Sequence, residues 1–166
     1  MRIVDHYNGQ ELKTLRFSDS TAISLSLANT ANTIYTYGDI TDNVIEGYAG
    51  KDVLIGDDGN DTLSGLAGND ALLGNDGMDI LIGEAGNDTL TGGMGDDYLT
   101  GGDGADTYVF SLGDGHDAIG NAQGGLWADK LVLGAGISLA NLQLNREGAD
   151  LVITFGNSNY RLIFPK

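Results

Sequence analysis

Between residues 47 and 109 the apolar residues recur with a period of nine. Written from Gly47, the segment divides into seven copies: GYAGKDVLI, GDDGNDTLS, GLAGNDALL, GNDGMDILI, GEAGNDTLT, GGMGDDYLT and GGDGADTYV. Position 8 is leucine, or tyrosine in the last copy, and positions 7 and 9 are mainly Thr, Ser, Val and Ile. This pattern predicts a short three-residue strand with position 8 inward and its neighbours outward. Such strands bury position 8 by coiling into a solenoid with a central column of these side chains.

The other six positions of each copy predict a turn. Positions 1 and 4 are glycine and position 6 is aspartate in all seven copies. Glycine repeated at a fixed place in a turn indicates backbone at positive φ or in close contact with another backbone, where a Cβ would obstruct. The aspartates therefore recur at a fixed place beside these tight turns.

The repeat matches the nonapeptide GGxGxDxUx of calcium-binding β-helices, and it resembles the repeats of the RTX (repeats-in-toxin) family of secreted bacterial proteins. The resemblance implies an all-β fold, a right-handed parallel β-roll in which two nonapeptides make one coil and calcium lies between stacked turns on both sides. Turns beginning at 47, 65, 83 and 101 would then stack on one side, and those at 56, 74 and 92 on the other. Position 3 agrees in part, because it is alanine in the first three turns of one side and aspartate in the first two of the other.

The candidate metal ligands are the position-6 carboxylates. Residues 47–109 carry 13 acidic side chains against one basic side chain, and stacked coils about 4.8 Å apart bring like charges together. An all-oxygen set without cysteine or histidine favours calcium over zinc or magnesium. Pairing turns two copies apart gives five sites: Asp52–Asp70, Asp61–Asp79, Asp70–Asp88, Asp79–Asp97 and Asp88–Asp106. An imperfect eighth turn at 113–117 adds Asp97–Asp117, so about five to six calcium ions are expected.

The family resemblance implies that carbonyls from positions 1 to 4 complete each calcium shell. The candidates are the carbonyls of Gly47, Ala49, Gly50, Gly56, Asp58, Gly59, Gly65, Ala67, Gly68, Gly74, Asp76, Gly77, Gly83, Ala85, Gly86, Gly92, Met94, Gly95, Gly101, Asp103 and Gly104. A degenerate copy at 38–46 has Asn43 at position 6 and lacks the position-4 glycine. A site there is expected to be weaker.

Three segments are predicted along the chain. Residues 1–46 form an N-terminal β cap with the degenerate repeat, 47–119 the calcium-binding β-roll, and 120–166 a C-terminal β-rich cap with strands near 131–133, 142–144, 151–155 and 160–164. Trp127 is expected in the cap core. The N-terminal segment, with an Asn8-Gly9 hairpin signal, resembles the element that follows the C-terminal strands in family members. Either it is an N-terminal cap, or the chain is a segment of a larger protein with tandem copies of this unit.

The charge composition favours some classes of binding partner over others. The formal charge is −16, from 24 acidic and 8 basic residues, which disfavours nucleic acid and anionic lipid as partners and favours cations. No apolar run is long enough to span a bilayer, and the first residues lack the basic-then-apolar order of a signal peptide. If the protein is secreted, we expect its secretion signal elsewhere or outside this segment. No catalytic or cofactor-binding residues are expected. A stack of equivalent aspartates has no distinct acid and base, and the spacings of a P-loop and an EF-hand are absent from the sequence. His6 and His116 are expected to be exposed to solvent.

The resemblance implies a function as well as a fold. One large side chain per nine residues is a thin core, so we expect the chain to be largely disordered without calcium and to fold on binding it. Calcium in the range of extracellular modules, about 10⁻⁴–10⁻³ M, would then fold the chain after type I secretion and support adjoining domains of a larger extracellular protein. The alternative is a calcium-dependent adhesin or carbohydrate-binding module on the same scaffold; a flat ice-binding face is disfavoured because the outward positions are irregular.

Overall fold

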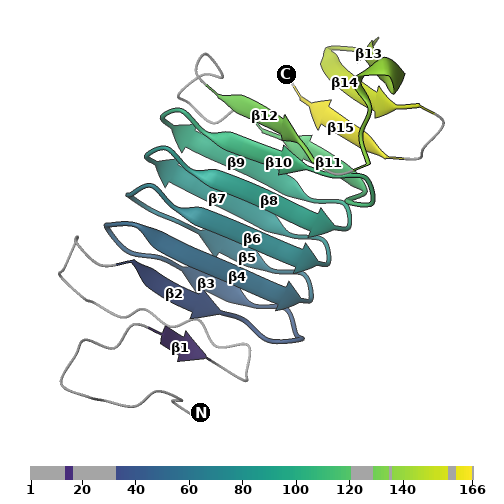
Figure 1. The fold of residues 1–166 in the computed structure, drawn as a ribbon. Helices are drawn as coiled ribbons and strands as arrows, with labels where there is room; N and C mark the ends of the chain where they lie inside the picture. The colour runs from purple at the N-terminus through teal and green to yellow at the C-terminus, as the bar shows by residue number, and fades with distance from the viewer. Residues whose placement is uncertain (1–13, 17–32, 121–128, 135, 157–159, 166) are drawn as a thin grey trace.

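The computed structural model describes residues 14–16, 33–120, 129–134, 136–156 and 160–165. The strands form a parallel β-roll, two sheets face to face with the chain alternating between them (Figure 1). The front sheet has the order β1-β2-β4-β6-β8-β10-β12, and the rear sheet the order β13-β14-β15-β11-β9-β7-β5-β3. The all-β solenoid predicted from the repeat is confirmed.

The strands of the front sheet are β1 (Thr14–Arg16), β2 (Ile34–Tyr37), β4 (Asp52–Asp58), β6 (Ala71–Asp76), β8 (Thr89–Met94), β10 (Thr107–Phe110) and β12 (Lys130–Leu133). Those of the rear sheet are β3 (Val44–Glu46), β5 (Thr62–Ser64), β7 (Ile80–Ala85), β9 (Tyr98–Asp103), β11 (His116–Ile119), β13 (Leu142–Glu147), β14 (Asp150–Phe155) and β15 (Arg161–Phe164). A 3₁₀ turn at Leu139–Asn141 precedes β13. In the described ranges no helix is long and apolar enough to cross a membrane.

Strands two repeats apart lie in register, as expected from the 18-residue coil. Leu54 pairs with Leu72 and Leu72 with Leu90 in the front sheet, and Leu63 pairs with Leu81 in the rear sheet. The position-8 side chains from Leu54 to Tyr108 are at most 3% exposed. The predicted core column is therefore confirmed, and every coil buries its leucine against the coils on both sides.

The prediction of three-residue strands is wrong for most of the array. β5 has three residues, but β6, β7, β8 and β9 have six each. The ladder continues through the turn, where Asn75 pairs with Gly93 and Glu84 with Gly102. The chain bends at position 2, where Leu66, for example, has a φ of 70°. A left-handed residue turns the chain without breaking the stacking hydrogen bonds, so turn and strand overlap.

A second row of hydrogen bonds runs along the outside of the turns at position 5. The side-chain Oδ1 of Asn69 accepts from the N–H of Asn87 at 2.9 Å, and Asn87 accepts in turn from Ala105 at 2.8 Å. Asn60 does the same for Met78 on the opposite side at 2.9 Å. The asparagine that follows glycine in several repeats therefore holds consecutive coils together.

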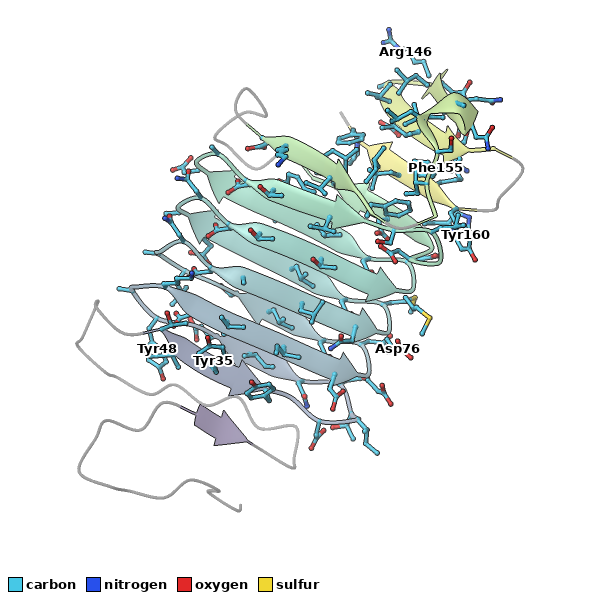
Figure 2. The ribbon with its side chains drawn as sticks, in the orientation of Figure 1. Tyr35, Tyr48, Asp76, Arg146, Phe155 and Tyr160 are labelled. Carbon is cyan, nitrogen blue, oxygen red and sulfur yellow. The ribbon has the colours of Figure 1, made fainter. Side chains whose placement is uncertain are left out.

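The C-terminal strands close the roll. β12 continues the front sheet on β10, and β15 continues the rear sheet on β11, both parallel. β13, β14 and β15 then form an antiparallel meander, seen beside the upper end of the roll in Figure 1. Phe155 of the meander (Figure 2) stacks on Phe110 with ring centroids 5.0 Å apart, and both are buried. The expected strands at 131–133, 142–144, 151–155 and 160–164 are all found, whereas Asn8-Gly9, His6 and Trp127 lie outside the described residues.

Candidate calcium-binding turns

The position-6 aspartates stand in two buried rows, one on each side of the roll. One row has Asp52, Asp70, Asp88 and Asp106, and the other has Asp61, Asp79, Asp97 and Asp117. All eight are at most 2% exposed. Buried carboxylates need partners, since an isolated charge removed from water is strongly unfavourable. The described residues place no lysine or arginine within salt-bridge distance of any of them.

From Asp61 onward, Oδ1 of each position-6 aspartate accepts from the backbone N–H of the position-6 residue one coil earlier. The N–H of Asp52 donates to Oδ1 of Asp70, and the pattern repeats every 18 residues at 2.7–2.9 Å. The last bond of the second row joins the N–H of Asp97 to Asp117 at 3.3 Å. Its partners are 20 residues apart, because the eighth turn is longer than the repeat. The predicted pairings are therefore spatial neighbours along each row.

The second oxygen is the unusual one. Oδ2 is buried and has no hydrogen-bond partner in six aspartates: Asp61, Asp70, Asp79, Asp88, Asp97 and Asp106. A buried oxygen left unsatisfied costs about 1–3 kcal/mol, more when it is charged. Six anionic oxygens in one repeated position are suited to binding cations.

The backbone around each Oδ2 adds further oxygens. A Cβ built at Gly65 would lie 2.6 Å from Oδ2 of Asp70 and 2.9 Å from the carbonyl oxygen of Gly83, one coil further on. A Cβ built at Gly47 would likewise lie 2.8 Å from Oδ2 of Asp52 and from the Gly65 carbonyl. Position 1 is therefore glycine because a carboxylate and a carbonyl of the next coil converge on its Cα. This cradle of oxygens fits a hard cation of the calcium type.

The other predicted backbone ligands differ in their surroundings. One position-4 carbonyl lies near a carboxylate, since a Cβ at Gly68 would collide with the Gly50 carbonyl and lie 2.9 Å from Oδ1 of Asp70. Position-3 carbonyls are already acceptors, as Ala85 accepts from the N–H of Gly68 at 2.8 Å. No group of three or more His, Cys, Asp or Glu side chains that could hold a metal occurs in the described part of the chain. Any metal here would therefore depend on backbone oxygens beside at most two carboxylates.

The first turn departs from the pattern. The N–H of Tyr48 donates to Oδ2 of Asp52 at 2.6 Å, so this oxygen is satisfied within its own turn. In the degenerate turn before it, Oδ1 of Asn43 accepts from the N–H of Asp39 at 2.6 Å, while the Asn43 N–H donates to Asp61 at 2.7 Å. In both turns the position-6 side chain accepts a hydrogen bond within its own turn. The repeat pattern indicated this departure for Asn43 but not for Asp52.

Sequence reasoning missed one carboxylate. Asp129 stands immediately before β12 and its Oδ1 accepts from the N–H of Asp106 at 2.9 Å, the bond that position-6 aspartates make elsewhere. Its spacing of 23 residues and the lack of a position-4 glycine hide it from the repeat. The segment Asp129-Lys130-Leu131-Val132 nevertheless preserves the order Asp-x-Leu-x of the repeats, and that is the signal that could have found it.

Burial and neighbouring carboxylates shift the titration of both rows. Burial, with a smaller contribution from nearby aspartates, raises the pKa of Asp61 and Asp88 to about 6 and of Asp70 and Asp97 to about 7. The pKa of Asp117 rises to about 8 for the same reasons. Each hydrogen bond from a backbone N–H works in the opposite direction and is outweighed.

The metal-free fold should therefore be stabilised by acid. These groups bind protons in the fold up to about pH 7 but release them near pH 4 when unfolded, so stability is greatest below about pH 4 and is lost as the pH rises towards 8. Thermal melts followed by far-UV circular dichroism in metal-free buffer measure this slope. Asp97→Asn should reduce the slope, while the exposed Asp103→Asn should leave it nearly unchanged. A stability that rises with pH would contradict the prediction.

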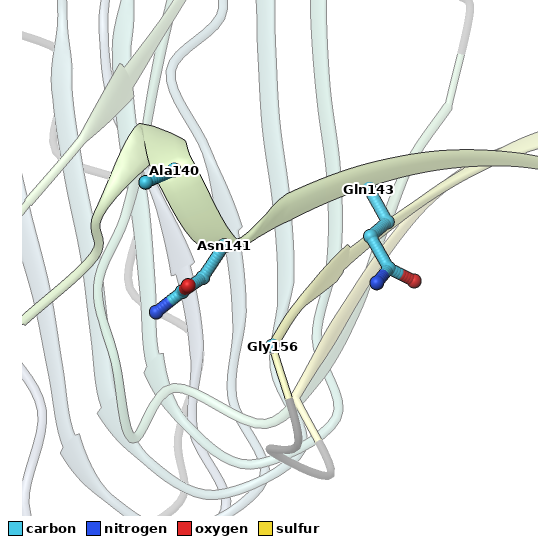
Figure 3. Close-up of a pocket in the computed structure, with 4 residues that line it drawn as sticks. All are labelled: Ala140, Asn141, Gln143 and Gly156. Carbon is cyan, nitrogen blue, oxygen red and sulfur yellow. The ribbon is translucent and has the colours of Figure 1, made fainter.

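Two further features, His116 and a pocket in the C-terminal cap, are not part of the aspartate rows. His116 is exposed, as expected, and its Nδ1 lies 3.0 Å from Oδ1 of Asp96. The pocket is open and is lined by Ala140, Asn141, Gln143 and Gly156 (Figure 3). None of these four lining residues carries a titratable side chain.

Solved structures similar to this chain include two bacterial proteins. The extracellular lipase LipA of Serratia marcescens is 20% identical with a TM-score of 0.38, over 82% of this chain and 38% of the lipase. The AlgE6R3 subunit of the Azotobacter vinelandii mannuronan C5-epimerase is 23% identical with a TM-score of 0.43, over 76% of this chain and 72% of the subunit. The chain thus spans well under half of the lipase. No curated protein sequence matches it.

The family comparison covers the array itself. The model of the RTX calcium-binding nonapeptide repeat, which holds four copies, matches residues 37–72 and again residues 73–108. The match begins with the degenerate turn of Asn43 and ends in the seventh copy, so it includes six of the position-6 aspartates with a partnerless buried oxygen. Residues 37–108 of this chain are therefore similar to RTX calcium-binding nonapeptide repeats over two consecutive matches.

Proposed function

We propose that the chain is a calcium-driven folding module of a larger bacterial protein that is secreted and acts outside the cell. The observation that carries the proposal is the set of six buried Oδ2 atoms without partners. Four of them, in Asp61, Asp70, Asp79 and Asp88, lie beside a position-1 glycine that a carbonyl of the next coil also approaches. Bound calcium would neutralise the two aspartate rows. The same rows, without calcium at neutral pH, oppose folding through burial of charge.

The proposed sites lie between consecutive aspartates of each row, with carbonyls of positions 1 and 4 as the supporting ligands. We infer about five to six ions, as the spacing predicts. Asp52 contributes less than the others, since Tyr48 already satisfies one of its oxygens. Each site at ten times its dissociation constant adds about 1.4 kcal/mol of stability, so the ions together supply several kcal/mol.

The proposed biological consequence is a switch between compartments. At sites with dissociation constants of about 10⁻⁴–10⁻³ M, calcium would be too scarce inside a cell to fold the array and abundant enough outside. The chain would pass through a secretion channel unfolded, fold outside and support the folding of adjoining domains. Adjoining domains, possible tandem copies of this unit and calcium are its proposed partners; catalysis is not part of its proposed role.

A calcium titration tests the proposal. In metal-free buffer at pH 8 the far-UV circular dichroism spectrum should be largely that of a disordered chain, and millimolar calcium should convert it cooperatively to a β spectrum. Magnesium at the same concentration is the control, since its smaller octahedral shell fits the cradle poorly. A fully folded spectrum at pH 8 in excess chelator would overturn the proposal.

A second function, calcium-dependent adhesion or carbohydrate binding, is favoured by the outer face of the rear sheet. Ile80 and Tyr98 pair in register there and are 42% and 43% exposed, and Val44 of β3 is 54% exposed. Exposed apolar and aromatic side chains in one row can contact the faces of sugar rings. A glycan array probed with and without calcium distinguishes the two functions, because a folding module alone gives no selective binding.

A further inference from the structure

The front sheet does not end with the seventh repeat. β12 pairs with β10 in register, Lys130 opposite Thr107 and Leu131 opposite Tyr108. The N–H of Lys130 donates to the carbonyl of Asp106 at 2.7 Å, as the N–H of Thr107 does to Asp88. β12 is therefore the next coil of the same row, although residues 121–133 do not follow the nonapeptide pattern.

This register places Asp129 where the next position-6 aspartate of the row would stand. Its Oδ1 accepts from the N–H of Asp106 at 2.9 Å, which equals the distance from the N–H of Asp88 to Asp106. The pair Asp106–Asp129 therefore has the same strand register and the same carboxylate hydrogen bond as the pair Asp88–Asp106.

The second observation is the state of Asp106. This side chain is 0% exposed, and its Oδ2 has no hydrogen-bond partner. That oxygen lies against the Cα of Gly101, where a Cβ would collide with it, the same orientation that Asp88 has against Gly83. A Cβ at Gly83 would also meet the carbonyl of Gly101, so the Oδ2 of Asp88 lies on the side of the next coil. The same placement of Oδ2 against Gly101 puts the free oxygen of Asp106 on the side of the row where β12 and Asp129 follow.

We propose that Asp106 and Asp129 form a further calcium site, beyond the 37–108 array, that joins the last coil of the front sheet to the segment leading into the cap. The inference rests on the proposed function, because it extends the same row by one ion. The two carboxylates are oxygen donors, and oxygen donors select a hard divalent cation.

The consequence concerns the end of the roll. β12 is the last strand of the front sheet and lies at its edge. A cation shared by Asp106 and Asp129 ties this edge strand to the array, so the segment carrying β12 becomes ordered on the same calcium signal as the repeats. The stacked turns and the connection to the cap then form one cooperative unit.

Counting ions tests the site. Native mass spectrometry of wild type and Asp129→Asn, at equal calcium, should show one ion fewer in the variant. Asn keeps the Oδ1 acceptor for the N–H of Asp106 while removing the charge. The control is Glu46→Gln, which neutralises an exposed carboxylate of β3 that is not among the candidate ligands and should keep the wild-type count. Equal counts and affinities in wild type and Asp129→Asn would overturn the inference and leave the proposed function intact; a wild type that binds no calcium would overturn both.

Tryptophan emission gives an independent readout. Trp127 is the only tryptophan of the chain and is two residues from Asp129, at most about 7 Å along the backbone. Terbium in place of calcium should show tryptophan-sensitised luminescence in the wild type and in Glu46→Gln, with a marked loss in Asp129→Asn. Equal luminescence in all three proteins would place the ion elsewhere.

Discussion

Replacing Gly86 by alanine should abolish the stacking of coils in the middle of the array. A Cβ at Gly86 would overlap the carbonyl of Gly68, a backbone atom that cannot rotate away. The N–H of Gly86 also donates to the carbonyl of Asp103 at 2.8 Å, so the turn cannot withdraw without breaking its contact with the next coil. We expect a loss of more than about 4 kcal/mol, among the largest effects of single substitutions, measured by urea unfolding in saturating calcium.

Gly113→Ala is the matched control. Gly113 has a φ of 118°, comparable with the 143° of Gly86, but a Cβ there would meet nothing within 4 Å. Its substitution carries only the cost of a left-handed alanine, about 1–2 kcal/mol. If the two variants lose the same stability, then backbone conformation rather than contact between coils explains the position-4 glycines.

Asp88→Asn should change stability in opposite directions with and without calcium. Asn retains the acceptor for the N–H of Asp70, now 2.8 Å from Oδ1, and Asn43 shows that an amide fits position 6 in a buried turn. Without calcium at pH 8 the variant loses a buried charge and becomes more stable. With calcium it weakens two sites, Asp70–Asp88 and Asp88–Asp106, and loses up to about 3 kcal/mol at ten times the dissociation constant.

The measurement is a pair of melts of each protein: a pH melt in chelator, which starts from the acid-stabilised fold and is followed by far-UV circular dichroism, and a urea melt in saturating calcium. Asp76→Asn serves as the control, because this position-3 carboxylate is exposed and points away from the roll at its edge (Figure 2). It should shift neither melt appreciably. Equal shifts for Asp76→Asn and Asp88→Asn would show that net charge, and not the buried row, governs the response to calcium.

Much of the fold follows from residues that repeat. Leu63 and Leu81 are equivalent in every local respect, so knowing one coil is enough to place the other, and the buried aspartates follow by the same rule. The backbone conformations of the turns were harder to predict from the sequence. Position 2 takes a positive φ even where it is Leu66 or Glu84, because stacking of the coils, and not the preference of the residue, fixes the backbone there.

The sequence predicted which carboxylates form the site, but not which of their oxygens receive hydrogen bonds. Asp52 and Asp70 are identical in the pattern, yet only Asp52 receives a hydrogen bond at Oδ2, from Tyr48. Whether a backbone N–H reaches that oxygen depends on the conformation of one turn, which the aspartate itself does not encode.

By itself, the sequence determined the nine-residue period, the inward leucine column, the glycine turns and the two rows of aspartates, because each of these is a local pattern repeated without insertion. Only the tertiary structure decided which carboxylate oxygens lack a partner, how far the strands extend through the turns, and that Asp129 joins the row of Asp106. The physical reason is that these features depend on contacts between coils. Where the spacing changes from 18 residues to 20 at Asp117 and 23 at Asp129, hydrogen bonding between strands sets the register.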